Sequence, residues 1–176
     1  MSKRPFIYFS EMNSPIGMLT VGKSDKGVCF IEFGSIKECL SSIETRLKKR
    51  LMNVILSEDK EKVMPALNQL DEYFQGKRTS FDLSLDLIGT KFQTLVWQKV
   101  KDIPYGETKS YKEIAFEIGA PKAVRAIGGA NNQNPIPIII PCHRVIGSNG
   151  SMVGYGGGLE KKEHLLRLEG AIRKIS

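Results

Sequence analysis

The sequence predicts an α+β protein of two domains, a small α/β domain over residues 1–89 and a mainly helical domain over residues 90–176. In the first half, short apolar runs alternate with polar residues, which is the period of strands. Beyond Gly89-Thr90 the apolar residues recur at the helical period instead. The half from residue 91 also holds 13 Lys and Arg against 7 Asp and Glu, and therefore +6 of the chain's net charge of +7. A basic half of this kind is typical of proteins with a polyanionic partner.

Three short apolar runs separated by turn residues begin the first domain. Asn13-Ser14-Pro15 and Asp25-Lys26-Gly27 favour turns, so the runs that they separate predict an antiparallel sheet. The predicted strands cover residues 6–9, 18–22 and 28–33. Cys29, in the third strand, is expected to be a small buried side chain.

Two helices and two further strands are predicted in the rest of this domain. Ser35 can cap the first helix, on which Cys39 is expected to be structural. Pro65 is unfavourable inside a helix, so an alternative start for the second helix lies near Met64. These predicted elements are helices over residues 36–51 and 60–74 and strands over residues 53–56 and 81–87.

Three helices are predicted at the start of the second domain. Thr90 and Ser110 can cap the first two, Gly119 ends the second, and Pro121 opens the third. Two short helices joined by a tight glycine-containing turn fit a DNA-binding helix-turn-helix, although such pairs are also ordinary packing units. The predicted helices cover residues 91–101, 111–118 and 122–130.

The helix after Pro121 has a side made of small residues and, beyond its first residue, Arg125 as its only long charged side chain. Small residues allow a backbone to approach a groove closely, and a lone Arg can probe a duplex. The alternative is tight packing against the core with Arg125 on the surface. The small residues are Ala123, Ala126, Gly128, Gly129 and Ala130.

Cys142 follows next in the sequence, at the end of an apolar run that is rich in β-branched residues. Residues 136–140 predict a buried strand, and Pro141 restricts the approach to Cys142. A thiol becomes nucleophilic as thiolate, which needs a base or a positive neighbour. His143 and Arg144 are the nearest candidates in the sequence.

A glycine-rich loop and a final helix follow. The loop over residues 146–158 surrounds Tyr155 and offers backbone amides and room for a flat ligand, without the spacing of a phosphate-binding loop. The helix is predicted over residues 159–169. Glu169 lies at the C-terminal end of this helix, where the helix dipole disfavours a carboxylate. This placement indicates a specific partner for Glu169, although a solvent-exposed Glu is the commoner explanation.

Composition excludes several classes of protein. No segment reaches transmembrane length and none resembles a signal peptide, so we expect a soluble cytoplasmic protein without a membrane partner. Three cysteines without close spacing, together with only two histidines, predict no metal site and suit a reducing compartment.

Several motifs of the second half resemble the O6-alkylguanine-DNA alkyltransferase family, the methylated-DNA–protein-cysteine methyltransferases. The resemblance extends from about Thr90 to Gly170, whereas the first half is similar only as an α/β domain of the expected size. The motifs are Pro104-Tyr105-Gly106-Glu107-Thr108, Arg125-Ala126-Ile127-Gly128-Gly129-Ala130, Asn134-Pro135, Pro141-Cys142-His143-Arg144-Val145 and Tyr155-Gly156-Gly157-Gly158-Leu159.

This resemblance implies a single-turnover repair protein that uses no cofactor. Cys142 would irreversibly accept the alkyl group of O6-alkylguanine and, less well, of O4-methylthymine. His143 would draw off the thiol proton through a water, and Glu169 would orient His143. Asn134 would brace the site, and Tyr111 would donate a proton to the leaving guanine. Arg144 would take no part and would hold the turn.

The resemblance also implies a ribonuclease-H-like first domain and a winged helix-turn-helix-like second domain that acts as a monomer on double-stranded DNA. The helix after Pro121 would enter the minor groove and Arg125 would fill the place of the flipped nucleotide. Tyr111 would contact the base and the rotated phosphate. Residues expected at the DNA are Ala123, Val124, Arg125, Ala126 and Gly128, and residues expected to line the base pocket are Asn131, Val145, Tyr155 and Gly156.

Three positions depart from some family members, and other functions stay open. Gly156 stands where some carry Ser, Asn131 where some carry Met, and Val124 where some carry Ala, which affects groove contact and the width of the pocket. The alternatives are a damage sensor that binds without transfer, a helix-turn-helix regulator and a Cys-His hydrolase. Known sensors of this type lack the cysteine that is present here as Cys142, and a regulator would need polar base-reading side chains after Pro121.

Overall fold

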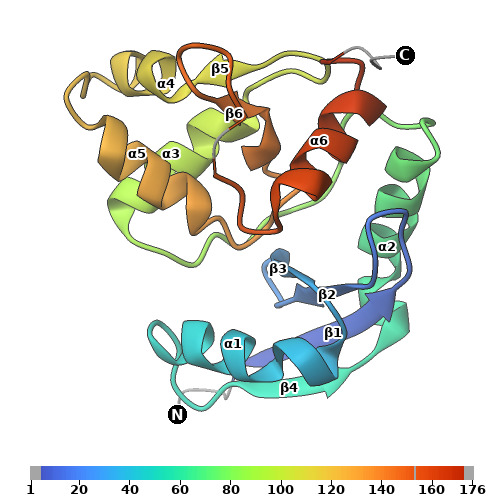
Figure 1. The fold of residues 1–176 in the computed structure, drawn as a ribbon. Coiled ribbons are helices and arrows are strands. Elements are labelled where there is room, and N and C mark those ends of the chain that lie inside the picture. Colours follow the sequence, from blue (N-terminus) through green and yellow to red (C-terminus); the bar gives the residue numbers. More distant parts are fainter. Residues whose placement is uncertain (1–4, 153, 173–176) are drawn as a thin grey trace. The chain divides into compact units, whose positions relative to one another are not determined.

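The computed structural model describes residues 5–152 and 154–172. The chain divides into two compact units, residues 1–89 and residues 90–176 (Figure 1). Each unit is described in turn. In the described part of the chain, no helix has the length and apolar character needed to cross a membrane.

The first unit is built on a four-stranded sheet of order β3-β2-β1-β4. The strands are β1 (Phe6–Met12), β2 (Leu19–Lys23), β3 (Val28–Phe33) and β4 (Ile55–Glu58). The first three pair antiparallel, as predicted, whereas β4 lies parallel to β1 and makes the sheet mixed. The strand predicted over residues 53–56 begins two residues later, because Asn53 adopts a left-handed φ of 55°, which continues the turn.

Two helices pack on this sheet. Helix α1 (Ile36–Lys48) has a complete capping box between Ser35 and Glu38. Helix α2 (Lys60–Phe74) has the predicted bounds, and the alternative start near Met64 is not the one adopted. Asp59 accepts from the Lys62 amide at 3.2 Å and caps a first turn ahead of Pro65. Burial of the apolar face of α2 against β1 and β2 offsets the cost of the interior proline.

Residues 81–87, predicted as a strand, form only a single bridge between Leu85 and Val28. The segment lies against the start of β3, where the Val28 amide donates to the Ser84 carbonyl at 2.9 Å. Gly27 has a φ of 145°, and a Cβ there would be 2.3 Å from the Ser84 oxygen. The prediction of a continuous strand over residues 81–87 is therefore wrong, although the segment does lie beside the sheet.

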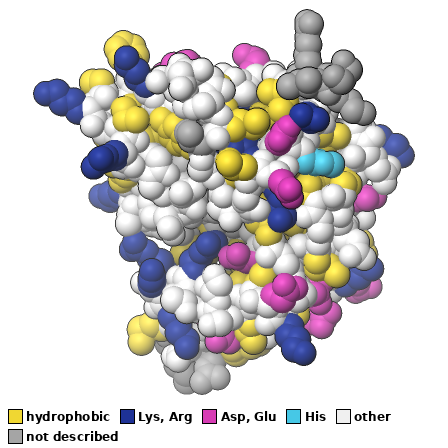
Figure 2. Space-filling model, viewed as in Figure 1, with side chains coloured by type: hydrophobic (Ala, Val, Ile, Leu, Met, Phe, Trp, Pro, Cys, Tyr) yellow, Lys and Arg dark blue, Asp and Glu magenta, His cyan; other side chains and the backbone are white. Residues whose placement is uncertain are grey.

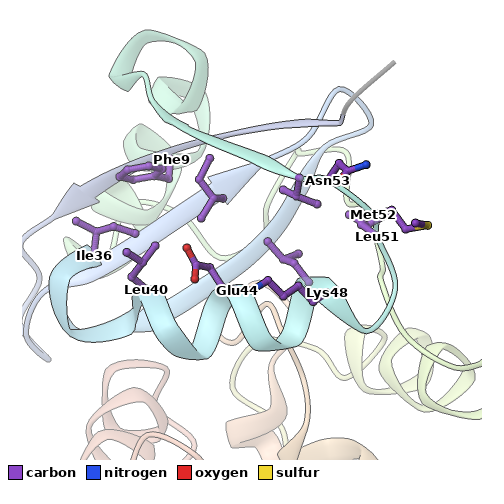
Figure 3. Close-up of a pocket in the computed structure, with 11 residues that line it drawn as sticks. Phe9, Ile36, Leu40, Glu44, Lys48, Leu51, Met52 and Asn53 are labelled. Atoms are coloured by element: carbon purple, nitrogen blue, oxygen red, sulfur yellow. The ribbon is translucent and has the colours of Figure 1, made fainter. Parts of the chain in front are cut away.

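A cavity of about 720 Å³ opens in the first unit, where α1 faces the chain that leads into β4. Figure 3 shows apolar side chains of α1, β1 and the connecting segment around it, with Glu44 and Lys48 among them. It borders the core formed by Ile7, Cys29, Phe30, Cys39, Ile43 and Leu47. None of the predicted site residues lines it.

The second unit is mainly helical. Helices α4 and α5 form the predicted helix pair and both contact α3. Helix α5 begins at Val124 rather than Lys122, because the preceding residues form a turn in which the Ala123 amide donates to the Ala120 carbonyl. A short parallel pair of strands, β5 (Lys109–Ser110) and β6 (Val145–Ile146), was not predicted. The helices are α3 (Lys91–Lys101), α4 (Tyr111–Glu117), α5 (Val124–Asn132) and α6 (Leu159–Leu168).

The run over residues 136–140 is a buried loop and not the predicted strand. Ile138 has a φ of 76°, and the Ile140 amide donates to the Ile136 carbonyl at 2.9 Å, which folds the run back on itself. Asn134 closes the loop, because its Nδ2 donates to the Ile140 carbonyl at 2.8 Å and its Oδ1 accepts from the Ile136 amide at 3.0 Å. The apolar β-branched composition thus reports burial rather than strand geometry.

Candidate active site

Cys142 is the first residue of a single 3-10 turn, η1 (Cys142–Arg144), that directly follows the loop closed by Asn134. Its side chain is buried, with 6% of the residue exposed. Asn131 on α5 donates from Nδ2 to the Cys142 carbonyl at 3.3 Å, so two asparagines fix the backbone around the thiol. This arrangement limits the conformations that the thiol can adopt before a reaction.

A buried carboxylate joins the two residues that follow the cysteine. Glu169, the C-cap of α6, lies 2.8 Å from His143 Nε2 through its Oε2. The same carboxylate accepts from Arg144 Nε at 2.8 Å and from Arg144 Nη2 at 2.8 Å. Arg144 Nη1 also donates to the Ile103 carbonyl at 2.6 Å. Arg144 was expected to be structural and to have no partner; it does have a structural role, but it holds the Glu169 carboxylate in a bidentate pair.

The electrostatics of these groups set their resting protonation. Burial raises the pKa of Glu169, but hydrogen bonds from His143 and Arg144 and their charges outweigh it and lower the pKa to about 2. Burial lowers the pKa of His143, although the hydrogen bond to Glu169 acts in the opposite direction. Burial raises the pKa of the Cys142 thiol to about 11, although hydrogen bonds from Asn134 and Tyr155 act in the opposite direction. The resting site thus holds a thiol, a neutral imidazole and a carboxylate.

His143 has one ring nitrogen left for chemistry. Its Nε2 is engaged by Glu169, and its Nδ1 is buried without a hydrogen-bond partner among the described residues. A neutral imidazole held in this way can take up a proton at the second nitrogen, and the carboxylate stabilises the imidazolium that forms.

Lys162 is a third charged group in the site, besides Glu169 and Arg144, and the sequence did not lead to its prediction. It lies on α6 with no exposed surface, and its Nζ donates to the Val145 carbonyl at 2.6 Å and to the Gly154 carbonyl at 3.3 Å. Burial lowers its pKa to about 8, and its charge lowers the pKa of Cys142. A signal existed in the sequence: Lys162 precedes Leu165 and Leu166 by three and four positions, which places it on the apolar face of the helix.

Tyr111 lies between α5 and the glycine-rich loop. A Cβ at Gly128 would be 3.9 Å from its ring, and a Cβ at Gly154 would be 3.9 Å from its hydroxyl. Burial raises its pKa, while a hydrogen bond with the Asn131 side chain opposes the rise. Tyr111 and Asn131 therefore lie beside Cys142, together with Tyr155 and the buried Val145.

Of the residues predicted to bind DNA, Tyr111 and Gly128 border this buried cluster, and the others lie on α5 or directly before it. Arg125 and Ala126 are exposed on α5, and Val124 is 37% exposed, while Ile127 of the same helix is buried in the core. Gly128 is half-buried and Ala123 caps the helix without a side-chain hydrogen bond. Figure 2 shows Lys and Arg side chains along the edge of the second unit where α4 and α5 lie. The outer face of α5 thus presents small residues and one long cation to solvent.

Possible metal ligands are scattered over the described residues. In residues 5–152 and 154–172, His, Cys, Asp and Glu side chains do not gather in threes with metal-ligating geometry.

Gly156, predicted to line the pocket, is exposed, and a Cβ there would make an ordinary contact 3.7 Å from the Asn132 carbonyl oxygen.

Comparisons with known proteins bear on both units. Residues 91–171 match the family model described as 6-O-methylguanine DNA methyltransferase, DNA binding domain. Residues 7–87 match the model of the ribonuclease-like domain of the same family. These matches confirm the predicted α+β fold class.

Individual relatives agree with the family models over nearly the whole chain. The methylated-DNA–protein-cysteine methyltransferase of Methanosarcina barkeri is 47% identical over 164 residues, 93% of this chain and 97% of that protein. The protein of the same name from Methanosarcina acetivorans is 44% identical over 94% of this chain and 99% of its own. The crystal structure of Mycobacterium tuberculosis OGT in complex with DNA is similar with a TM-score of 0.79 and 42% identity, covering 94% of this chain and 93% of that one.

Proposed function

The chain belongs to the 6-O-methylguanine DNA methyltransferase family, and from this membership we infer how its second unit acts on DNA. It is a methylated-DNA–protein-cysteine methyltransferase that reverses O6-methylation of guanine directly by transfer to one of its own cysteines. We assign the acceptor to Cys142. The observation that carries this assignment is the burial of its thiol beside a neutral His143 that is paired with Glu169.

The transfer is a displacement at the alkyl carbon. The Cys142 sulfur forms a bond to that carbon while the bond from the carbon to guanine O6 breaks and leaves its electron pair on the base. The thiol proton passes to His143, through a water at Nδ1, and Glu169 balances the charge of the imidazolium. Because burial raises the pKa of Tyr111, its phenol keeps a proton to donate to the leaving guanine and regains one from solvent.

The product explains why each molecule acts once. A thioether has no proton to lose and is a poor leaving group, so Cys142 is not regenerated by the groups around it. Transfer is therefore stoichiometric, and the protein is consumed as a reagent. Asn134 supports the reaction by holding the loop that carries the thiol and by lowering the pKa of Cys142.

The target base must leave the duplex, because Cys142 is buried. We propose that α5 enters the minor groove of double-stranded DNA, where its exposed small residues allow close approach. Arg125 then occupies the space of the extruded nucleotide. The base enters the pocket lined by Tyr111, Asn131, Val145, Tyr155 and Gly156.

Intact mass after mixing with a duplex that carries O6-methylguanine tests the assignment. We expect one methyl group per protein molecule, located on Cys142, and no second turnover. Cys142→Ala is expected to accept none, whereas Cys39→Ala, a matched loss of a buried thiol in the first unit, should react fully. A wild-type protein that binds the duplex without gaining mass would instead be a damage sensor.

Replacing Arg125 with Ala tests the extrusion of the base. Transfer from saturating duplex is expected to slow about tenfold or more, because no side chain then occupies the space that the extruded nucleotide leaves between the stacked bases. Transfer from free O6-methylguanine should be unchanged. Lys122→Ala removes an exposed charge just ahead of the same helix and should leave both rates unchanged at saturating DNA. Equal slowing on duplex and free base in Arg125→Ala would exclude a role in extrusion.

The cellular setting belongs to the proposal as well. Cys29, Cys39 and Cys142 are all free thiols, which suits a reducing compartment. We place the protein in the cytoplasm, acting as a monomer. A helix-turn-helix regulator is disfavoured, because the first two turns of α5 expose mainly Val124, Ala126 and Gly129, with Arg125 as the one side chain there that can read a base edge.

A further inference from the structure

Asn131 carries a buried acceptor that receives no hydrogen bond from the described residues. The residue lies in the last turn of α5 and is 3% exposed. Its Nδ2 donates to the Cys142 carbonyl at 3.3 Å. Its Oδ1 is fully buried and has no hydrogen-bond partner within the described part of the chain. A buried carbonyl oxygen in this state is unfavourable unless a ligand supplies a donor.

The orientation of this amide is fixed by its surroundings. Exchanging the amide oxygen and nitrogen would set Oδ1 against the Cys142 carbonyl oxygen, and two acceptors repel each other. The side chain also lies beside Tyr111, whose hydroxyl borders the glycine-rich loop. The side chain that carries the unused acceptor therefore lies against Cys142 and Tyr111, the nucleophile and a residue that we assign to the base pocket.

The chemistry of alkylated bases shows which of them can satisfy it. Alkylation at O6 removes the N1 proton of guanine, so the exocyclic amine is the N–H donor left on that edge. Alkylation at O4 removes the N3 proton of thymine and leaves its pairing edge without a donor. A pocket with a buried acceptor rejects a base that lacks the matching N–H, because the acceptor then stays unpaired.

We propose that Asn131 Oδ1 accepts a hydrogen bond from the exocyclic amine of the extruded O6-alkylguanine and thereby sets the preference for this base over O4-alkylthymine. The inference depends on the proposed function, since it needs a base beside Cys142. It gives Asn131 a role in specificity, distinct from the bracing role of Asn134, whose amide oxygen and nitrogen are both used within the protein.

Single-turnover rates on three otherwise identical duplexes test this role. The duplexes carry O6-methylguanine, O6-methylhypoxanthine, which is the same base without the exocyclic amine, or O4-methylthymine. We expect wild-type protein to react with O6-methylguanine about tenfold or more faster than with O6-methylhypoxanthine. In Asn131→Leu this ratio should fall to near one, and the preference over O4-methylthymine should shrink with it.

Asn132→Leu is the matched control, because Asn132 is the exposed neighbour of Asn131 on the same helix and should keep the wild-type ratio. A preference that survives in Asn131→Leu would overturn the inference, since another group would then read the amine. Equal wild-type rates on O6-methylguanine and O6-methylhypoxanthine would overturn it even if Asn131→Leu failed to fold. Failure of the proposed function looks different, because no duplex would then transfer a methyl group to Cys142.

Discussion

Replacing Glu169 with Gln is expected to destabilise the second unit and to slow transfer strongly. The substitution leaves the Arg144 guanidinium buried without its carboxylate, a type of change that costs about 3–5 kcal/mol. It also removes the anion that stabilises the His143 imidazolium, so transfer should slow about 100-fold or more. Urea unfolding and single-turnover rates measure the two effects separately.

Glu163→Gln provides the control for this substitution. Glu163 is on α6 and pairs with Arg167, but its side chain is 40% exposed, so its loss should cost about 0–1 kcal/mol and leave the rate unchanged. If Glu169→Gln behaved like Glu163→Gln in both measurements, the buried pair would have neither of the roles assigned to it.

The stability of the wild type should also depend on pH through this carboxylate. The pKa of Glu169 is about 2 in the folded protein, below the ordinary value of 4.5, so the folded state binds fewer protons than the unfolded state. The stabilisation is complete above about pH 4.5 and is lost as the pH falls through about 2. It amounts to about 3 kcal/mol. Glu169→Gln should lack this component of the acid dependence.

Replacing Lys162 with Met is expected to slow transfer about 10- to 100-fold while preserving most of the fold. The buried ammonium lowers the pKa of Cys142, so without it the thiol should ionise less readily in the transition state. Met retains an apolar stem of similar length, so the loss of stability should be smaller than for Glu169→Gln. Single-turnover rates measured across pH provide the test.

The pH profile distinguishes this electrostatic role from a packing role. The pKa of Lys162 is about 8, because burial disfavours its charged form, so the wild-type rate should lose the benefit of the cation above that pH. Lys162→Met should show no such loss. Lys161→Met, on the same helix, should retain the wild-type profile. A wild-type rate that rises unchanged through pH 8 would argue against the cation as the source of thiolate stabilisation.

Local signals in the sequence predicted much of the fold and most of the candidate site. Helix α3 has the predicted bounds because Thr90 and Gln93 form a capping box that fixes its start. The cysteine and histidine were found because thiol chemistry demands a neighbouring base. Glu169 was noticed because a carboxylate at a helix end opposes the dipole, and its role beside His143 came from the family resemblance. Each of these inferences uses residues that are close in sequence or a rule that applies to one element.

The errors arose where tertiary contacts override local pattern. Residues 136–140 have strand composition, yet Asn134 bonds both ends of the run and forces Ile138 into a left-handed conformation. Arg144 was given no partner, because its sharing of Glu169 depends on how α6 packs against η1. Lys162 was overlooked because a lysine is rarely buried, and nothing adjacent to it in sequence shows that Nζ meets the Val145 carbonyl.

The separation of 25 positions between Arg144 and Glu169 also imposes an order on biosynthesis. A ribosome makes and releases a chain from its N-terminus, so the cysteine, histidine and arginine emerge before the carboxylate does. Until α6 docks, the imidazole has no anion to stabilise its protonated form and the thiol has no Lys162 cation beside it. In a nascent chain the Cys142 thiol therefore lacks the groups that promote its ionisation. The protein can accept an alkyl group only after α6 has formed and docked.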